Sequence, residues 1–180
     1  YQVSQKLIPY HQHNEHKNLQ LVIERLLNGE ILAVCTDAGT PGISDPGFLL
    51  IREAIQANIE VITLPGPVAA IVAIVGSGLP CDAFIYEGFL PHKKGKQTKI
   101  KNLVEEKRTT IFYESPHRII KTLQMIEEIL GNTRQVAIGR ELTKKFEEYI
   151  RGTATELLAH FMQHEPKGEF VLMIAGYDKK

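Results

Sequence analysis

A loop rich in glycine and proline is the clearest candidate for a binding site. Residues 37–47 contain three glycines and two prolines and directly follow an apolar run at 31–36. Glycine permits positive φ and lets a ligand approach the backbone, whereas proline fixes φ. A strand that ends in such a loop presents backbone N–H groups beyond the sheet, and the loop exceeds the roughly 2–6 residues usual between strand and helix. We predict a small-molecule site; the alternative is a turn-rich connection without a ligand.

Two further predicted strand ends carry titratable side chains. Residues 114–118 (Glu-Ser-Pro-His-Arg) follow an expected strand at 109–113, and residues 139–145 (Gly-Arg-Glu-Leu-Thr-Lys-Lys) follow one at 135–139. Ligand crevices of α/β proteins lie at the carboxyl ends of strands. Taken singly, each segment fits a surface loop, with Ser115 as a helix N-cap. Taken with the 37–47 loop, they favour a shared crevice.

Lysines dominate the segment 92–101, which is the strongest charge asymmetry in the chain. Such a run is usually a solvated face, but beside a ligand cleft it could bind the phosphates of a nucleic acid. We expect phosphate contacts from four lysines of this segment. They are Lys93, Lys94, Lys96 and Lys99.

Composition and charge exclude several classes of protein. Lys plus Arg and Asp plus Glu both number 21, so no overall field attracts nucleic acid or an anionic membrane. The longest apolar stretch, 68–75, is far shorter than the roughly 20 residues of a membrane span. We expect Cys35 and Cys81 to be reduced core residues of a cytoplasmic protein. The histidines near residue 11 lack a second ligand cluster, so we expect no metal site.

Hydrophobic periodicity predicts an α/β organisation. In the first half, we expect a helix from Asn14 to Asn28, followed by a strand at 31–36, a helix from Phe48 and a strand at 59–64. The last three elements form a βαβ unit with parallel strands. A short apolar helix follows 65–67, and the glycines at 76–80 resemble a hinge. We therefore predict domains at 1–80 and 81–180.

The second half repeats the alternation of strands and helices. Strands are expected at 83–86, 109–113, 135–139, 146–150 and 169–175, and helices at 116–130 and 154–161, besides one that ends near residue 106. Pro116 suits the first turn of its helix.

Five motifs in this order and spacing resemble one family. They are Thr36–Gly47, Leu64–Pro67, Glu87–Pro91, Phe112–Arg118 and Arg140–Lys144. Together they are similar to the bacterial methyltransferases that modify the 2′-hydroxyl of a cytidine ribose in small-subunit ribosomal RNA, within the tetrapyrrole-methylase superfamily. The resemblance covers essentially the whole chain and implies two α/β domains with S-adenosylmethionine in a cleft between them.

The resemblance also implies which residues bind the cofactor. The first domain would supply Asp37, Ala38, Gly39, Thr40, Pro41, Ser44 and Ala69. The second would supply Tyr113, Glu114, Glu141 and Ala175, on strand position more than on motif identity. A ribose hydroxyl needs a base or a nearby cation. Glu114, Glu141 and Lys144 are the main candidates, with Asp37 and Arg140 beside them.

One departure concerns the start of the chain. The family opens with a strand, a cofactor loop and an acidic motif, none of which precedes Tyr1. We therefore expect an incomplete N-terminal domain. The resemblance implies a cytoplasmic homodimer that acts on ribosomal RNA or the small ribosomal subunit. The alternatives are a methylase of a tetrapyrrole or another small molecule, and a non-catalytic module that binds a ligand or RNA.

Overall fold

The computed structural model describes residues 4–11, 13–92 and 95–178. The chain forms two compact units, Tyr1–Val68 and Ala69–Lys180. Their boundary lies before the predicted one at 80/81, because helix α3 (Ala69–Ser77) packs on the sheet of the second unit. The α/β fold class is confirmed by the second unit, and the binding role of each domain stays a prediction.

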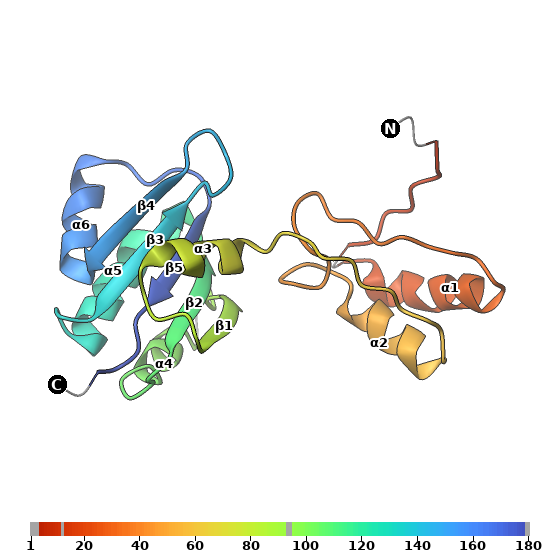
Figure 1. Cartoon of the computed structure of the whole chain (residues 1–180), viewed down its shortest axis with the longest axis horizontal. Coiled ribbons are helices and arrows are strands. Elements are labelled where there is room, and N and C mark those ends of the chain that lie inside the picture. The colour runs from red at the N-terminus through yellow and green to blue at the C-terminus, as the bar shows by residue number, and fades with distance from the viewer. Residues whose placement is uncertain (1–3, 12, 93–94, 179–180) are drawn as a thin grey trace. The chain divides into compact units, whose positions relative to one another are not determined.

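The first unit is built on two helices, α1 (Glu15–Leu27) and α2 (Phe48–Gln56) (Figure 1). Apolar residues recur along each at helical spacing, so one stripe faces the other helix. Val22 and Ile23 of α1 form a small core with Leu50 and Ala54 of α2.

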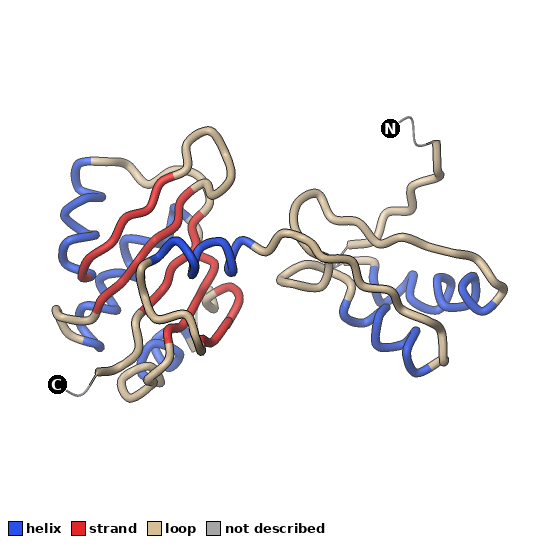
Figure 2. The backbone as a smooth tube through the Cα atoms, in the orientation of Figure 1, coloured by secondary structure: helices blue, strands red, loops and turns tan. Residues whose placement is uncertain are grey.

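The strands predicted at 31–36 and 59–64 are wrong. Both segments are drawn as loop in Figure 2, and the described part of this unit contains no strand. Ile31 is 98% exposed and Leu64 is 78% exposed. An apolar β-branched run becomes a strand only where a neighbour pairs with it, and parallel strands need both faces covered. The prediction that Cys35 and Cys81 are core residues is also wrong, because both are exposed.

The second unit is a five-stranded sheet with the order β1-β2-β5-β3-β4. The strands are β1 (Phe84–Phe89), β2 (Thr109–Glu114), β3 (Gln135–Arg140), β4 (Glu148–Thr153) and β5 (Phe170–Ile174). Strands β1 and β2 are parallel, and the other neighbours are antiparallel. The expected strands of this half are confirmed, although the fourth begins at residue 148 rather than 146.

Helices cover both faces of this sheet (Figure 1). Helices α4 (Lys96–Lys101), α5 (Pro116–Leu130) and α6 (Ala154–Gln163) enclose the main core, in which Leu123 and Leu157 pack with Phe112, Ile138 and Leu172 of the strands. Helix α3 packs on the opposite face. Tyr149 Oη donates to Val72 O at 2.9 Å, and Arg151 Nε donates to Ser77 O at 3.0 Å, which fixes the end of the helix.

The strand directions bring three chain segments to one edge of the sheet. Glu114 at the end of β2 pairs with Phe170 at the start of β5, which pairs with Arg140 at the end of β3. The polar segments that follow β2 and β3 therefore share an edge, whereas the predicted crevice shared with the 37–47 loop stays a prediction. None of the helices in the described ranges combines the length and the apolar character needed to cross a bilayer.

Candidate ligand-binding loop and sheet edge

The glycine-proline loop of the first unit is an ordered bend. Thr36 Oγ1 donates to Gly39 O at 2.8 Å, and Gly42 N donates to Pro46 O at 3.3 Å. Gly39 and Gly42 have φ of 85° and 83°, values that favour glycine. The sequence pattern thus encodes a defined turn, and its residues 37–39 are exposed to solvent.

A single hydroxyl joins this loop to the Pro-Gly-Pro turn at 65–67. Thr40 Oγ1 donates to Pro67 O at 3.0 Å. A Cβ placed on Gly66 would lie 2.7 Å from that hydroxyl, so a larger residue would separate the two segments. The result is a bare backbone surface with small side chains, which fits a ligand held by main-chain groups. Sequence reasoning missed Pro67 as an acceptor, because carbonyl contacts leave no residue-type signal.

In the second unit, an aromatic cluster surrounds Tyr113 beside the start of α3. Tyr113 Oη accepts a hydrogen bond from Ala70 N at 3.2 Å. The rings of Tyr86 and Phe89 meet the Tyr113 ring edge-on, each with centroids 5.4 Å apart. The structure therefore brings Ala69 and Tyr113, two of the predicted cofactor residues, to neighbouring positions.

Glu114 lies in a buried polar network, which we call the Glu114 network. Its side chain is 0% exposed. Its Oε2 accepts from Thr122 Oγ1 at 2.7 Å and Lys96 Nζ at 3.3 Å, and its Oε1 accepts from Arg118 Nε at 2.6 Å and Ser115 N at 2.8 Å. Every carboxylate oxygen therefore has two donors.

Opposing effects act on the pKa of Glu114. Burial raises the pKa, but hydrogen bonds from Thr122, Ser115 and Arg118, with the charge of Lys96, lower it more. The net result is a lowered pKa, so the carboxylate is a weak proton acceptor. The structure thus argues against Glu114 as a base or a cofactor contact and favours a structural role that fixes the start of α5.

The same network corrects the prediction for Lys96. Its side chain is only 11% exposed and is paired with Glu114, so Lys96 is not available to a phosphate. Lys99 is 42% exposed and paired with Glu87. Lys93 and Lys94 lie outside the described residues. Thr122 and Arg118 were missed, although the spacing Glu114, Arg118, Thr122 places all three on one side of a helix start.

Glu141 and Lys144 form a second polar cluster at the same edge. Glu141 Oε1 accepts from Glu169 N at 2.9 Å and from Lys144 Nζ at 3.0 Å. These hydrogen bonds lower the pKa of Glu141, in that order of effect. Hydrogen bonds to Glu169 and Glu141 raise the pKa of Lys144, whose side chain is 46% exposed. Lys144 therefore stays a cation at neutral pH, and Glu141 stays ionised.

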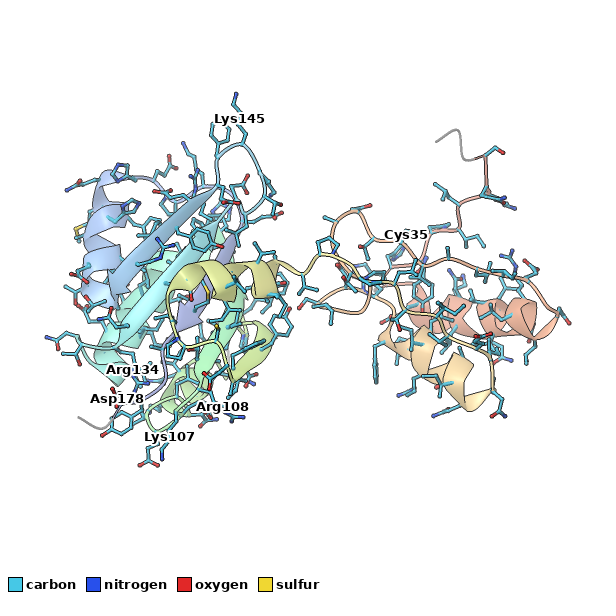
Figure 3. The ribbon with its side chains drawn as sticks, viewed as in Figure 1. Cys35, Lys107, Arg108, Arg134, Lys145 and Asp178 are labelled. Atoms are coloured by element: carbon cyan, nitrogen blue, oxygen red, sulfur yellow. The ribbon has the colours of Figure 1, made fainter. Side chains whose placement is uncertain are left out.

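The predicted cofactor role of Ala175 is not supported by its position. Ala175 follows β5, which runs antiparallel to β2 and β3, so it lies at the edge where those strands begin. Its N donates to Gln135 O at 2.9 Å, and its O accepts from Arg134 Nη1 at 3.0 Å. Figure 3 places Arg134 and Lys145 at opposite ends of the second unit. Ala175 is thus far along the sheet from Glu114 and Glu141.

Comparison with known proteins identifies related sequences and folds. The profile of the family described as "Tetrapyrrole (Corrin/Porphyrin) Methylases" matches residues 4–158. The chain is 45% identical over 177 residues to "Ribosomal RNA small subunit methyltransferase I" of Synechocystis sp., covering 98% of this chain and 63% of that protein. It therefore spans less than two thirds of that relative's length.

Solved structures share the fold at low sequence identity. The methyltransferase CobJ aligns with a TM-score of 0.68 and 16% identity, covering 92% of this chain and 73% of that one. Uroporphyrin-III C-methyltransferase from Thermus thermophilus, solved in complex with S-adenyl homocysteine, aligns with a TM-score of 0.61 and 13% identity, covering 92% and 75%. With the profile match over most of its length, the chain belongs to the tetrapyrrole (corrin/porphyrin) methylases.

Proposed function

We propose that this protein transfers a methyl group from S-adenosylmethionine to the 2′-hydroxyl of a cytidine ribose in small-subunit ribosomal RNA. The observation that carries the proposal is the ordered 37–47 loop, joined to the 65–67 turn through Thr40, in a chain 45% identical to a protein named as a small-subunit ribosomal RNA methyltransferase. The chain spans 63% of the length of that relative.

The residues of the loop fit the cofactor. Exposed backbone at 37–39 and small side chains leave room for a ligand, and the candidate contacts remain Asp37, Ala38, Gly39, Thr40, Pro41 and Ser44. Ala69 and Tyr113 of the second unit stay candidate cofactor contacts, and Tyr113 Oη accepts from the N of Ala70, the residue after Ala69. S-adenosylmethionine supplies an electrophilic methyl group, so the protein has to provide alignment and exclude water. Alignment alone can lower the barrier by roughly 7–11 kcal/mol.

Among the three candidates for the chemical step, Lys144 has the most suitable properties. Glu114 is buried, and Glu141 has a lowered pKa that makes it a poor base. Lys144 is half-exposed and has a raised pKa. We infer that the Lys144 ammonium stabilises the negative charge that develops on the ribose oxygen.

The alternative substrate is a tetrapyrrole. The structural neighbours named as uroporphyrin-III C-methyltransferases are at most 16% identical, a level that supports the fold alone. No observation on this chain favours that substrate over RNA. We further expect a homodimer and a cytoplasmic location, both on the family resemblance.

Methyl transfer to two substrates tests the function. The protein is incubated with tritiated S-adenosylmethionine and either unmodified small ribosomal subunits or uroporphyrinogen III. We expect label in RNA, recovered as 2′-O-methylcytidine after digestion to nucleosides. Label in the tetrapyrrole alone would establish the alternative, and label in neither would contradict both.

A further inference from the structure

The loop between β3 and β4, residues 141–147, presents an exposed aromatic ring beside a cation. Phe146 is 63% exposed, and Lys145 Nζ lies over its ring, 5.5 Å from the centroid. Figure 3 shows Lys145 at the tip of this loop, pointing away from the sheet. Among the described residues, no carboxylate pairs with Lys145 at salt-bridge distance, in contrast to Lys144.

The rest of the loop is held in place. Leu142 is buried, and Thr143 N donates to Glu147 Oε2 at 2.6 Å. Glu141 and Thr143 have φ of 48° and 64°, an uncommon conformation for glutamate and a strained one for a β-branched threonine. Such strain persists only where surrounding contacts fix it, so the tip is presented on a rigid frame.

The frame extends to neighbouring segments. Glu141 N donates to Glu169 O at 3.0 Å, and Arg140 donates to Lys167 O at 2.8 Å and to Phe146 O at 3.4 Å. The carboxylate of Glu141 points to Glu169 N and Lys144, inside the cluster. Thr143, Lys144 and Glu147 are also exposed, but Glu147 accepts from Thr143 N and Lys144 is paired with Glu141 and Glu169, whereas Lys145 and Phe146 extend from the loop with no ion pair among the described residues.

We propose that Phe146 and Lys145 form a clamp for an unstacked base of single-stranded RNA, which we call the 145–146 clamp. The proposal rests on the proposed function and names the conformation of its substrate. An exposed ring stacks on any base, worth roughly 1–3 kcal/mol per base, and a lysine beside it can contact the adjacent phosphate. The clamp stands at the sheet edge that carries Lys144, where a splayed nucleotide has to be presented.

The charge of the loop predicts that base stacking contributes more than phosphate contacts to RNA binding at the clamp. The loop carries two lysines and two glutamates, so its formal charge is zero. Of the four lysines first predicted to contact RNA, Lys96 is engaged in the Glu114 network and Lys99 is paired with Glu87, while Lys93 and Lys94 lie outside the described residues. A neutral loop with one outward cation predicts that RNA affinity depends weakly on salt. In a plot of the logarithm of the binding constant against the logarithm of the salt concentration, one phosphate contact contributes about 0.7 to the magnitude of the slope.

A single tryptophan reports on the clamp directly. The chain contains no tryptophan, so Phe146→Trp introduces the only indole. We expect single-stranded RNA of mixed sequence to quench its fluorescence and duplex RNA of the same sequence to quench it much less. Met162→Trp is the matched control, because Met162 is 86% exposed on α6 and lies outside the loop. Its indole should not respond.

Two further variants separate stacking from charge. Phe146→Ala should raise the Kd for fluorescein-labelled single-stranded RNA roughly 5- to 150-fold, and Lys145→Gln should lower the salt slope by about 0.7. Lys121→Gln, on the exposed face of α5, removes the same charge and should change neither. Unchanged thermal unfolding of each variant shows that the fold is kept.

The outcomes distinguish this inference from the proposed function. If Phe146→Trp is not quenched, or Phe146→Ala methylates RNA with an unchanged KM, the clamp is wrong while methyl transfer stands. If quenching occurs but the wild-type protein transfers no methyl group, the function fails and the clamp stands. A fluorescence shift with anionic phosphatidylglycerol vesicles and none with RNA would overturn the clamp in favour of a membrane contact.

Discussion

Two cations share the single carboxylate of Glu114, so removal of this carboxylate would leave two positive charges without a partner. Lys96 and Arg118 both donate to Glu114, and their side chains are 11% and 18% exposed. Loss of one partner of a buried pair leaves charge without compensation in a poorly solvated site. The residue that sequence reasoning placed among the reacting groups is therefore expected to act on stability.

Replacement of Glu114 tests this role. Glu114→Ala should lower the free energy of unfolding by about 3–5 kcal/mol, the range seen when a buried pair loses one member. Glu114→Gln keeps part of the hydrogen bonding and should lower the free energy of unfolding by less than Glu114→Ala does. Urea unfolding measures both, with Glu128→Gln on the exposed side of α5 as the control. A change below about 0.5 kcal/mol for Glu114→Ala would contradict the network's structural role.

The lowered pKa of Glu114 predicts how stability depends on pH. A carboxyl group whose pKa is lower in the folded protein contributes stability above its unfolded pKa and loses that contribution as pH falls through the folded value. The ordinary value for glutamate is 4.5, so the loss should begin near pH 4.5 and grow on further acidification. In Glu114→Gln this part of the pH dependence should be absent. An identical acid slope in both proteins would show that Glu114 does not titrate as proposed.

Lys144 carries the prediction for the chemical step. Lys144→Met should lower kcat for RNA methylation about 10²- to 10³-fold, the range for removal of one group that stabilises an oxyanion, with little change in the affinity for S-adenosylmethionine. Lys144→Arg retains the cation and should recover much of the rate. Its ion pairs are exposed, so stability should change by less than about 1 kcal/mol. Equal kcat values for wild type and Lys144→Met would remove Lys144 from the mechanism.

At the scale of elements, the local sequence predicted an element correctly where residues within or next to that element cap it or bury it. Helix α5 begins after Ser115, whose hydroxyl accepts from His117 N at 3.3 Å, and Thr153 and Glu156 form a capping box at α6. Ile111 and Phe112 of β2, residues 136–138 of β3 and all of β5 are apolar and buried. The runs at 31–36 and 59–64 carry the same signal, yet their state depends on neighbours that no local pattern specifies. The Glu114 network was missed for the same reason, since Lys96 comes from another helix.

The packing of α3 on the sheet predicts a steric coupling. A Cβ on Gly76 would overlap the ring of Tyr149. Gly76→Ala should therefore displace the end of α3 and cost about 1–3 kcal/mol, as overpacking does. In a Tyr149→Ala background the same change should cost much less, and a double-mutant cycle measured by urea unfolding gives the coupling. Additive effects would mean that the helix end moves freely away from Tyr149.

At the scale of the whole molecule, the two units differ in how much core they possess. Among the described residues, the main hydrophobic cluster of the second unit contains sixteen buried residues, whereas the cluster of the first unit contains four. A small core supports little stability against the entropy of the chain. The first unit carries the glycine-proline loop, so the proposed cofactor site lies in the less stable unit, where ligand binding has the largest effect on order.

Limited proteolysis tests this difference. A nonspecific protease should cleave first within 28–47, where the exposed segment includes Ile31 at 98% exposure, and should leave a fragment that contains the sheet of 84–174. Mass spectrometry of the products identifies the sites. Saturating S-adenosylmethionine should slow that cleavage. Early cleavage between β2 and β5 would contradict the assignment of stability to the second unit.

The most direct test of the central claim is calorimetric titration of S-adenosylmethionine into the wild-type protein, Thr40→Ser and Thr40→Val. The hydroxyl of Thr40 joins the 37–47 loop to Pro67, so its loss should remove one hydrogen bond, worth roughly 0.5–1.5 kcal/mol, that shapes the site. We predict one-site binding by the wild type, similar binding by Thr40→Ser, and an affinity roughly 2- to 12-fold lower for Thr40→Val. No binding by the wild type, or equal affinity for all three proteins, would contradict the account.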